Sequence, residues 1–189
     1  PELAWQTMKM VTTAEDFEVS PPTGIQRNTI DQIIQHLMTI PEDFTPLRKV
    51  HRLLKGKQKL LDAGQLDWAM AELQAYGSIL LEGKDVRISG QDVKRGTFSH
   101  RHAILNDTKT FEDYNRLNHI QDQQGKFRIF NSLLSEFGAL GFEYGYSLST
   151  PDSLVIWEAQ FGDFYNGAQT IVDQYITAAE SKWQRMSGL

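Results

Sequence analysis

The stretch DVRISGQDVKRGTFSHRH, residues 85–102, begins as a short apolar strand and continues as a polar loop. The same arrangement returns in SLVIWEAQFGDF, residues 153–164, where an apolar run of strand length is followed by a second loop. A helical pattern lies between the two, and strands that alternate with helices favour a parallel sheet with helices packed on it. Because ligands collect at the carboxyl ends of such strands, the loops at residues 90–102 and 158–164 form the candidate site.

The helix between the two strands is expected to begin after Ser135, a suitable N-cap residue, and to run to about Leu148. Gly138, Gly141 and Gly145 recur within it at three- and four-residue spacing, so they share one face. Each glycine disfavours a helix by up to about 1 kcal/mol relative to alanine. The spacing therefore indicates that another helix or strand approaches this face closely.

Further helices are expected on both sides of this region. Asn28 is a possible cap for the first helix, and Thr45–Pro46 is a start signal for the next, with proline at the first helical position. A third, largely apolar helix is expected over residues 66–81, and a last one over residues 164–182. The long polar stretch of residues 90–130 is expected to contain turns.

The first residues have a different character. They contain MVTTAEDFEVSPPTG, whose Pro-Pro pair and final glycine are typical of an extended arm or linker. We therefore divide the chain into an extended arm (residues 1–24), a helical segment (residues 25–64) and an α/β domain (residues 65–189).

The composition excludes several classes of function. The 189 residues include 19 Lys and Arg against 24 Asp and Glu, a net charge of −5 that argues against a general nucleic-acid binder. The absence of cysteine excludes a disulfide scaffold, a thiolate zinc site and a thiol nucleophile. No apolar run approaches the roughly 18 residues of a membrane span, so no membrane partner is expected. Neither a phosphate-binding glycine motif nor a serine-nucleophile motif occurs.

The SHRH motif places His100 and His102 on either side of Arg101. In an extended segment both imidazoles would share one face and could bind one metal ion. However, the spacing marks no third ligand, and the guanidinium between them would repel a cation. We therefore expect a polar loop that faces an anion or an interface, and no metal site.

Three residues of the candidate site also have ordinary structural explanations. A carboxylate at Glu136, at the start of a helix, complements the helix dipole, usually with less than about 1 kcal/mol of stabilisation. The rings of Phe161 and Phe164 could serve packing alone. None of these residues identifies a reaction by itself.

Together, however, three longer segments closely resemble one enzyme family. The segments are VRISGQDVKRGTFSHRH (86–102), the run from LLSEFG to DQYI (133–176) and AAESKWQRMSGL (178–189). The family consists of the decarboxylating, thiamine-diphosphate-dependent components of 2-oxoglutarate dehydrogenase complexes. The resemblance implies the family's transketolase-like domain for the cofactor's aminopyrimidine, a parallel sheet of six strands between helices, here incomplete at its C-terminal end. It also implies that diphosphate and magnesium are bound by a different domain, outside this chain.

The resemblance assigns roles to individual residues. Glu136 in LLSEFG matches the glutamate that hydrogen-bonds the pyrimidine ring nitrogen, so that the exocyclic amine can remove the thiazolium proton. Phe161 matches the aromatic residue that stacks on the pyrimidine, and Phe164 is expected near the same ring. Gln91 occupies a position that family members use near the cofactor. The resemblance gives no definite role to His100 or His102.

The implied reaction is decarboxylation of 2-oxoglutarate and transfer of the succinyl group to a lipoyl group on a partner acyltransferase. The implied enzyme is a homodimer whose cofactor lies between subunits, and the isolated chain is expected to be inactive. A 2-oxoadipate dehydrogenase shares these segments and stays open as an alternative, as does a non-catalytic interaction module of the same fold. A bacterial cytoplasmic location is expected, with the mitochondrial matrix as the alternative.

Overall fold

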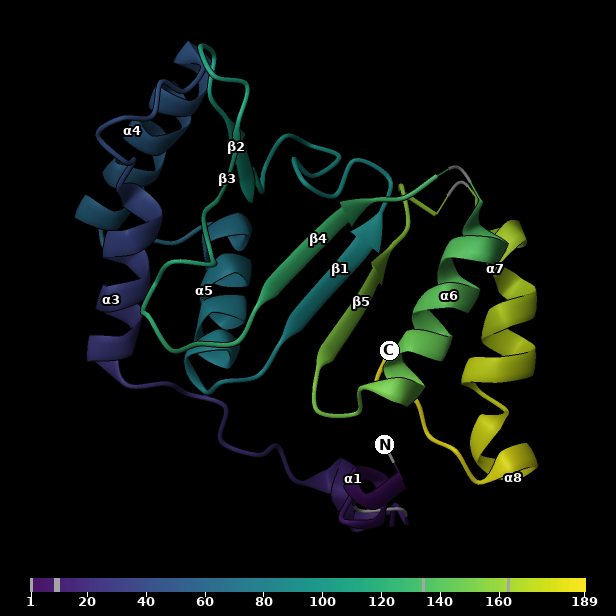
Figure 1. Ribbon diagram of the computed structural model, residues 1–189. Coiled ribbons are helices and arrows are strands. Elements are labelled where there is room, and N and C mark those ends of the chain that lie inside the picture. The colour runs from purple at the N-terminus through teal and green to yellow at the C-terminus, as the bar shows by residue number, and fades with distance from the viewer. Residues whose placement is uncertain (1, 9–10, 134, 163) are drawn as a thin grey trace.

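A parallel sheet of three strands forms the centre of the molecule (Figure 1). The computed structural model describes residues 2–8, 11–133, 135–162 and 164–189. The strands, in the spatial order β4-β1-β5, are β1 (Val86–Gly90), β4 (Phe127–Asn131) and β5 (Leu154–Glu158). Gly90 pairs with Asn131 on one side and with Glu158 on the other, so all three strands end level at one edge. The predicted α/β fold with a parallel sheet is confirmed.

Helices cover both faces of this sheet (Figure 1). Those on one side precede β1 in the chain and are α3 (Arg27–Met38), α4 (Arg48–Asp62) and α5 (Trp68–Leu81). Those on the other side are α6 (Glu136–Ser149), α7 (Tyr165–Ile171), the π-helix η1 (Val172–Ile176) and α8 (Ala179–Trp183). α5 contacts β1, while α6 contacts β1 and β5. No helix within the described residues is long and apolar enough to cross a membrane.

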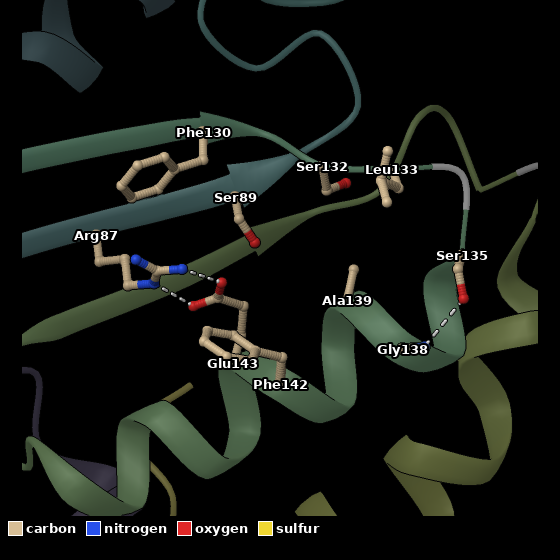
Figure 2. A pocket seen from close by; sticks show the side chains of 10 residues that line it. All are labelled: Arg87, Ser89, Phe130, Ser132, Leu133, Ser135, Gly138, Ala139, Phe142 and Glu143. Atoms are coloured by element: carbon tan, nitrogen blue, oxygen red, sulfur yellow. Dashed lines mark hydrogen bonds and ion pairs between the residues drawn. The ribbon is translucent and has the colours of Figure 1, made fainter.

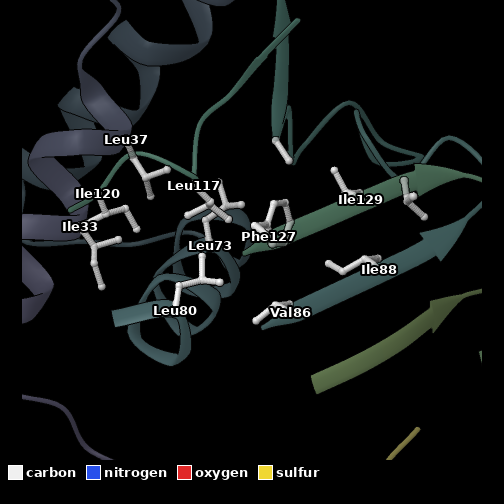
Figure 3. Packing of buried hydrophobic residues seen from close by; sticks show 12 residues of the cluster. Ile33, Leu37, Leu73, Leu80, Val86, Ile88, Leu117, Ile120, Phe127 and Ile129 are labelled. Carbon is white, nitrogen blue, oxygen red and sulfur yellow. The ribbon is translucent and has the colours of Figure 1, made fainter. Parts of the chain in front are cut away.

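The alternation of side chains along β1 separates the two faces. Val86 and Ile88 are fully buried in the main hydrophobic cluster, which also contains Phe127 of β4 and side chains of α5 (Figure 3). Burial of each such aliphatic side chain stabilises the fold by about 1.5–3 kcal/mol. Arg87, which lies between them, points to the opposite face and pairs there with Glu143 of α6. The strand thus has an apolar face toward α5 and a polar one toward α6.

The helix α6 begins where the sequence predicts. The Ser135 hydroxyl accepts a hydrogen bond from the Gly138 backbone N–H at 3.2 Å, which confirms the predicted N-cap. The expectation about the glycines is correct only for Gly141, where an added Cβ would lie 3.4 Å from Ile171 of α7. An added Cβ at Gly145 would meet no atom within 4 Å. The close approach to another element therefore concerns one glycine and not the whole face.

Two predicted helix starts are wrong. α3 begins one residue before Asn28, which is therefore not its cap. α4 begins two residues after Pro46, and Thr45–Pro46 instead contacts a distant part of the chain. The Thr45 backbone N–H donates to Asp107 Oδ2 at 2.5 Å, and Pro46 forms an isolated β-bridge with the same residue. A tertiary contact thus uses the residues that locally would begin a helix.

Several elements differ from the pattern-based prediction. The stretch expected to contain only turns also contains β4 and an antiparallel pair, β2 (Ile104–Asn106) and β3 (Asp113–Asn115). The segment expected to be an extended arm contains two short helices, α1 (Glu2–Gln6) and α2 (Glu15–Glu18). The final predicted helix is present in three parts, α7, η1 and α8.

Candidate functional site

The backbones of β1 and β5 approach each other closely at the carboxyl edge of the sheet. A Cβ added to Gly90, the last residue of β1, would lie 2.2 Å from the backbone carbonyl oxygen of Glu158 and 2.8 Å from Val93 Cγ1. Only glycine therefore fits at this position. The loops that follow the two strands, residues 91–103 and 159–164, start side by side from this contact.

Gln91 and Glu136 meet at this edge, although they are far apart in the sequence. Glu136 is the first residue of α6 and is half-buried, and its Oε1 accepts a hydrogen bond from Gln91 Nε2 at 2.5 Å. The other amide atom, Gln91 Oε1, is buried and has no hydrogen-bond partner among the described residues. Gly167 of α7 lies beside the carboxylate, because a Cβ there would be 3.4 Å from Glu136 Oε2. The pair therefore offers a carboxylate and a free amide oxygen side by side.

Phe161 lies three residues beyond β5 and exposes 57% of its surface. Its backbone has a φ of +65°, a conformation that a non-glycine residue rarely adopts. Its ring meets the ring of Phe98 edge to face, with 5.3 Å between centroids. The structure thus connects the loop after β5 with the loop after β1 through two exposed rings. Phe164, directly before α7, is also partly exposed, and no ring contact within the described residues joins it to this pair.

Arg101 lies between the two histidines but is itself buried, with 2% of its surface exposed. Its guanidinium donates to both carboxylate oxygens of Glu158, to Glu72 of α5 at 2.6 Å and to the Val93 carbonyl at 2.7 Å. Burial lowers the pKa of Arg101, but the hydrogen bonds that Arg101 donates to Glu158 and Glu72 outweigh this effect and raise the pKa above its ordinary value. The anions that Arg101 faces therefore belong to this chain.

The two histidines do not converge on a common point. The ring of His100 lies against Phe98, and its Nε2 is 3.9 Å from Glu72 Oε2. His102 has a φ of +42°, and burial, together with nearby cationic side chains, lowers its pKa. Across the described residues, no three His, Asp or Glu side chains are close enough to one another to bind a metal ion.

An apolar pocket of about 310 Å³ lies between β1, β4 and the first turns of α6 (Figure 2). At its base, Arg87 pairs with Glu143 at 2.7 Å and packs 4.7 Å from the Phe130 ring centroid. Exposed apolar side chains surround the pocket and continue along α6. We call this set the α6 apolar surface; it consists of Phe130, Leu133 and Phe142. A contiguous apolar surface of this kind marks an interaction site in many soluble proteins.

Sequence reasoning missed the partners of Arg101 and Arg87. Glu72 is the only charged residue of α5, a helix that is otherwise apolar or neutral. A single charge in such a helix indicates a buried ion pair, because an unpaired buried carboxylate is costly. Glu143 carries a similar signal, because it is the one charged residue in the interior of α6, whose other glutamate is at its first position. What could not be predicted is which arginine each glutamate meets.

The residues at this edge fit the aminopyrimidine of thiamine diphosphate. A ring nitrogen needs a carboxyl group, which Glu136 provides, and the flat ring needs an accessible aromatic face, which Phe161 provides. The unsatisfied Gln91 Oε1 adds an acceptor for an N–H donor. The chain therefore contains the polar and aromatic groups that this half of the cofactor requires.

Comparison with known proteins agrees with this interpretation. Residues 64–189 match a family model described as the transketolase pyrimidine binding domain. The chain is 54% identical over 170 residues to the mitochondrial 2-oxoglutarate dehydrogenase of Caenorhabditis elegans, covering 89% of this chain and 16% of that protein. It is 52% identical over 171 residues to the mitochondrial enzyme of Schizosaccharomyces pombe, covering 90% and 17%. The 2-oxoglutarate dehydrogenase E1 component of Brucella anthropi is 46% identical over 187 residues, covering 98% and 19%. The chain thus spans less than a fifth of the length of these relatives.

Proposed function

This chain belongs to the family of transketolase pyrimidine-binding domains, and from this premise we propose that it supplies the half-site for the aminopyrimidine of thiamine diphosphate in a 2-oxo acid dehydrogenase. The observation that carries the proposal is the Glu136 carboxylate, which Gln91 holds at the same edge as the exposed Phe161 ring. When bound, thiamine diphosphate accepts the electrons released as carbon dioxide leaves a 2-oxo acid.

The residues of this chain bind and orient one end of the cofactor. Glu136 holds a proton between its carboxylate and the ring nitrogen, and Gln91 fixes the direction of that carboxylate. Phe161 offers a face for stacking. Gln91 Oε1 is free to accept a hydrogen bond from the cofactor. We therefore propose Gln91, Glu136 and Phe161 as cofactor-binding residues, and Phe164 as a fourth one near the same ring.

We further propose that the substrate is 2-oxoglutarate and that the succinyl group passes to a lipoyl group on a partner acyltransferase. The names of the relatives, which are 2-oxoglutarate dehydrogenases, support the choice of substrate. Diphosphate and magnesium would be bound by a domain outside this chain. A homodimer accounts for the α6 apolar surface, which a second subunit would cover. Relatives occur in mitochondria and in bacteria, so we propose either the mitochondrial matrix or the bacterial cytoplasm as the location.

The direct test is Glu136→Ala in the full-length enzyme. Turnover of 2-oxoglutarate is expected to fall by about 10²–10⁴-fold, the usual contribution of a positioned acid or base, while the fold persists. Carbon dioxide release with an artificial electron acceptor measures the chemistry without the partner acyltransferase. The same assay with 2-oxoadipate distinguishes the two substrates.

A matched control is Glu180→Ala, which removes an exposed glutamate from the first turn of α8. It should leave turnover unchanged, because this carboxylate complements only a helix dipole. Near-normal turnover by a folded Glu136→Ala enzyme would leave only the helix-dipole role for Glu136 and would contradict the proposed function.

A further inference from the structure

Arg101 joins three parts of the molecule that lie far apart in the sequence. Its own loop follows β1, Glu72 is on α5, and Glu158 is the last residue of β5. The guanidinium Nη1 and Nη2 donate to the two carboxylate oxygens of Glu158, and Nε donates to Glu72. A lysine could not make these contacts at the same time, since it has a single point charge and no planar fork.

Arg101 cannot act on a ligand directly, because only 2% of its surface is exposed and its donors are used within the chain. Replacing a buried ion pair by apolar residues is often neutral or stabilising, so stability alone is a weak reason for this cluster. Its location offers a better reason. Both loops of the candidate site leave the sheet next to it.

The loop after β5 has a conformation that needs support. Phe161 and Gly162 both have positive φ, +65° and +120°. The positive φ of Phe161 is strained, because its side chain carries a Cβ, and such strain persists only where the surroundings determine it. Gly162 adopts its positive φ without this strain. The loop that carries Arg101 provides two contacts, the ion pair to Glu158 and the packing of Phe98 on Phe161.

We propose that Arg101 is a positioning residue of the cofactor half-site, which orients the Phe161 ring through Glu158 and through the loop that carries Phe98. The inference rests on the proposed function, because it concerns the ring on which the aminopyrimidine would stack. The opposite end of the same loop carries Gln91, which holds Glu136. One loop thus sets the positions of both the aromatic and the acidic contact.

The experiment is a double-mutant cycle in the full-length enzyme with Arg101→Lys and Phe161→Ala. The dissociation constant of thiamine diphosphate, measured by calorimetric titration with magnesium present, is the readout. Arg101→Lys should weaken binding by about tenfold in the original background and by less than about twofold in the Phe161→Ala background. This loss of effect is the signature of a residue that acts through Phe161.

A matched control is Arg128→Lys, which removes the guanidinium that pairs with Asp85 at the opposite end of the sheet. It should leave the dissociation constant unchanged. Amide hydrogen exchange without cofactor is a second readout: Arg101→Lys should raise exchange at residues 158–162, whereas Arg128→Lys should not.

The results are separable. Equal weakening by Arg101→Lys in both backgrounds, or no weakening, would overturn the positioning role while the proposed function stands. If the original enzyme does not bind thiamine diphosphate, the proposed function is wrong and the positioning role is overturned with it. Should Arg101→Lys fail to fold, Glu158→Gln replaces it in the cycle, because it keeps the size of the side chain and removes the charge that Arg101 holds.

Discussion

Replacing Gly90 by alanine is expected to damage the sheet and the site together. The new Cβ would lie 2.2 Å from the carbonyl oxygen of Glu158, whereas ordinary contacts begin near 3.4 Å, so the end of β5 must move by about 1 Å. The neighbour is backbone that is paired in the sheet, so it cannot move aside as a flexible side chain would. The displacement would also alter the start of the loop after β5, which carries Phe161.

The magnitude follows from the cost of overpacking. Inserting a methyl group into a well-packed region costs typically about 1–3 kcal/mol, and the rigid neighbour places Gly90→Ala near the upper end, about 3 kcal/mol. For a chain of this length that corresponds to a fall in melting temperature of roughly 6–12 °C. Urea unfolding followed by circular dichroism measures the free energy of unfolding directly.

The control is Gly145→Ala in the middle of α6, where the added Cβ meets no atom within 4 Å. This change should stabilise the protein by up to about 1 kcal/mol, because alanine is the better helix former. The reasoning would be refuted if the free energy of unfolding of Gly90→Ala lay within about 0.5 kcal/mol of the original value, or if both variants lost the same amount of it.

Two other predictions concern cofactor binding and α5. The isolated 189-residue chain should bind thiamine diphosphate with a dissociation constant of about millimolar or weaker. Stacking on Phe161 and one hydrogen bond to Glu136 contribute on the order of 1 kcal/mol each, and association itself costs more than that. A micromolar dissociation constant in a calorimetric titration would contradict the proposal that the chain supplies only half of the site. Asp67→Ala should lower the free energy of unfolding by about 2 kcal/mol. It removes the N-cap carboxylate that accepts a hydrogen bond from the Met70 N–H, and it leaves the buried Lys57 without this ion pair. Burial raises the pKa of Asp67, but the hydrogen bond and the charge of Lys57 outweigh burial, so the pKa lies below its ordinary value. The stabilisation by the ionised Asp67 is therefore present above about pH 4 and is lost as the pH falls through the lowered pKa. An Asp67→Asn protein that unfolds with the same acid dependence as the original would show that Asp67 is not the source.

Local signals predicted the elements that local chemistry determines. The Ser135 cap, the strands at residues 85–89 and 153–160 and the apolar helix at residues 66–81 all have counterparts at or near these positions. Each of these depends on side chains within a few residues. The parallel arrangement of the two strands predicted a candidate site at the carboxyl edge of the sheet, and the Gln91–Glu136 contact lies at that edge.

What the sequence did not reveal depends on distant contacts. β4 has the same length as β1 and β5, but it follows a long polar stretch and no helical pattern separates it from β1, so it did not stand out in the sequence. Thr45 and Pro46 form their contacts with Asp107, about sixty residues away, and that contact outweighs the local preference for a helix start. In the same way, the charge pattern marks Glu72 as a residue that needs a partner, but only the fold selects Arg101.

The loop of residues 91–103 also has a consequence for how this protein can vary in length. Surface loops ordinarily accept inserted residues. In this loop, Gln91 has a fixed partner on α6, whereas Phe98 and Arg101 have fixed partners at the end of β5 and in the loop after it. One inserted residue adds up to about 3.5 Å of chain, which is enough to separate at least one of them from its partner. We expect the spacing among these three residues to be constant wherever the site is retained.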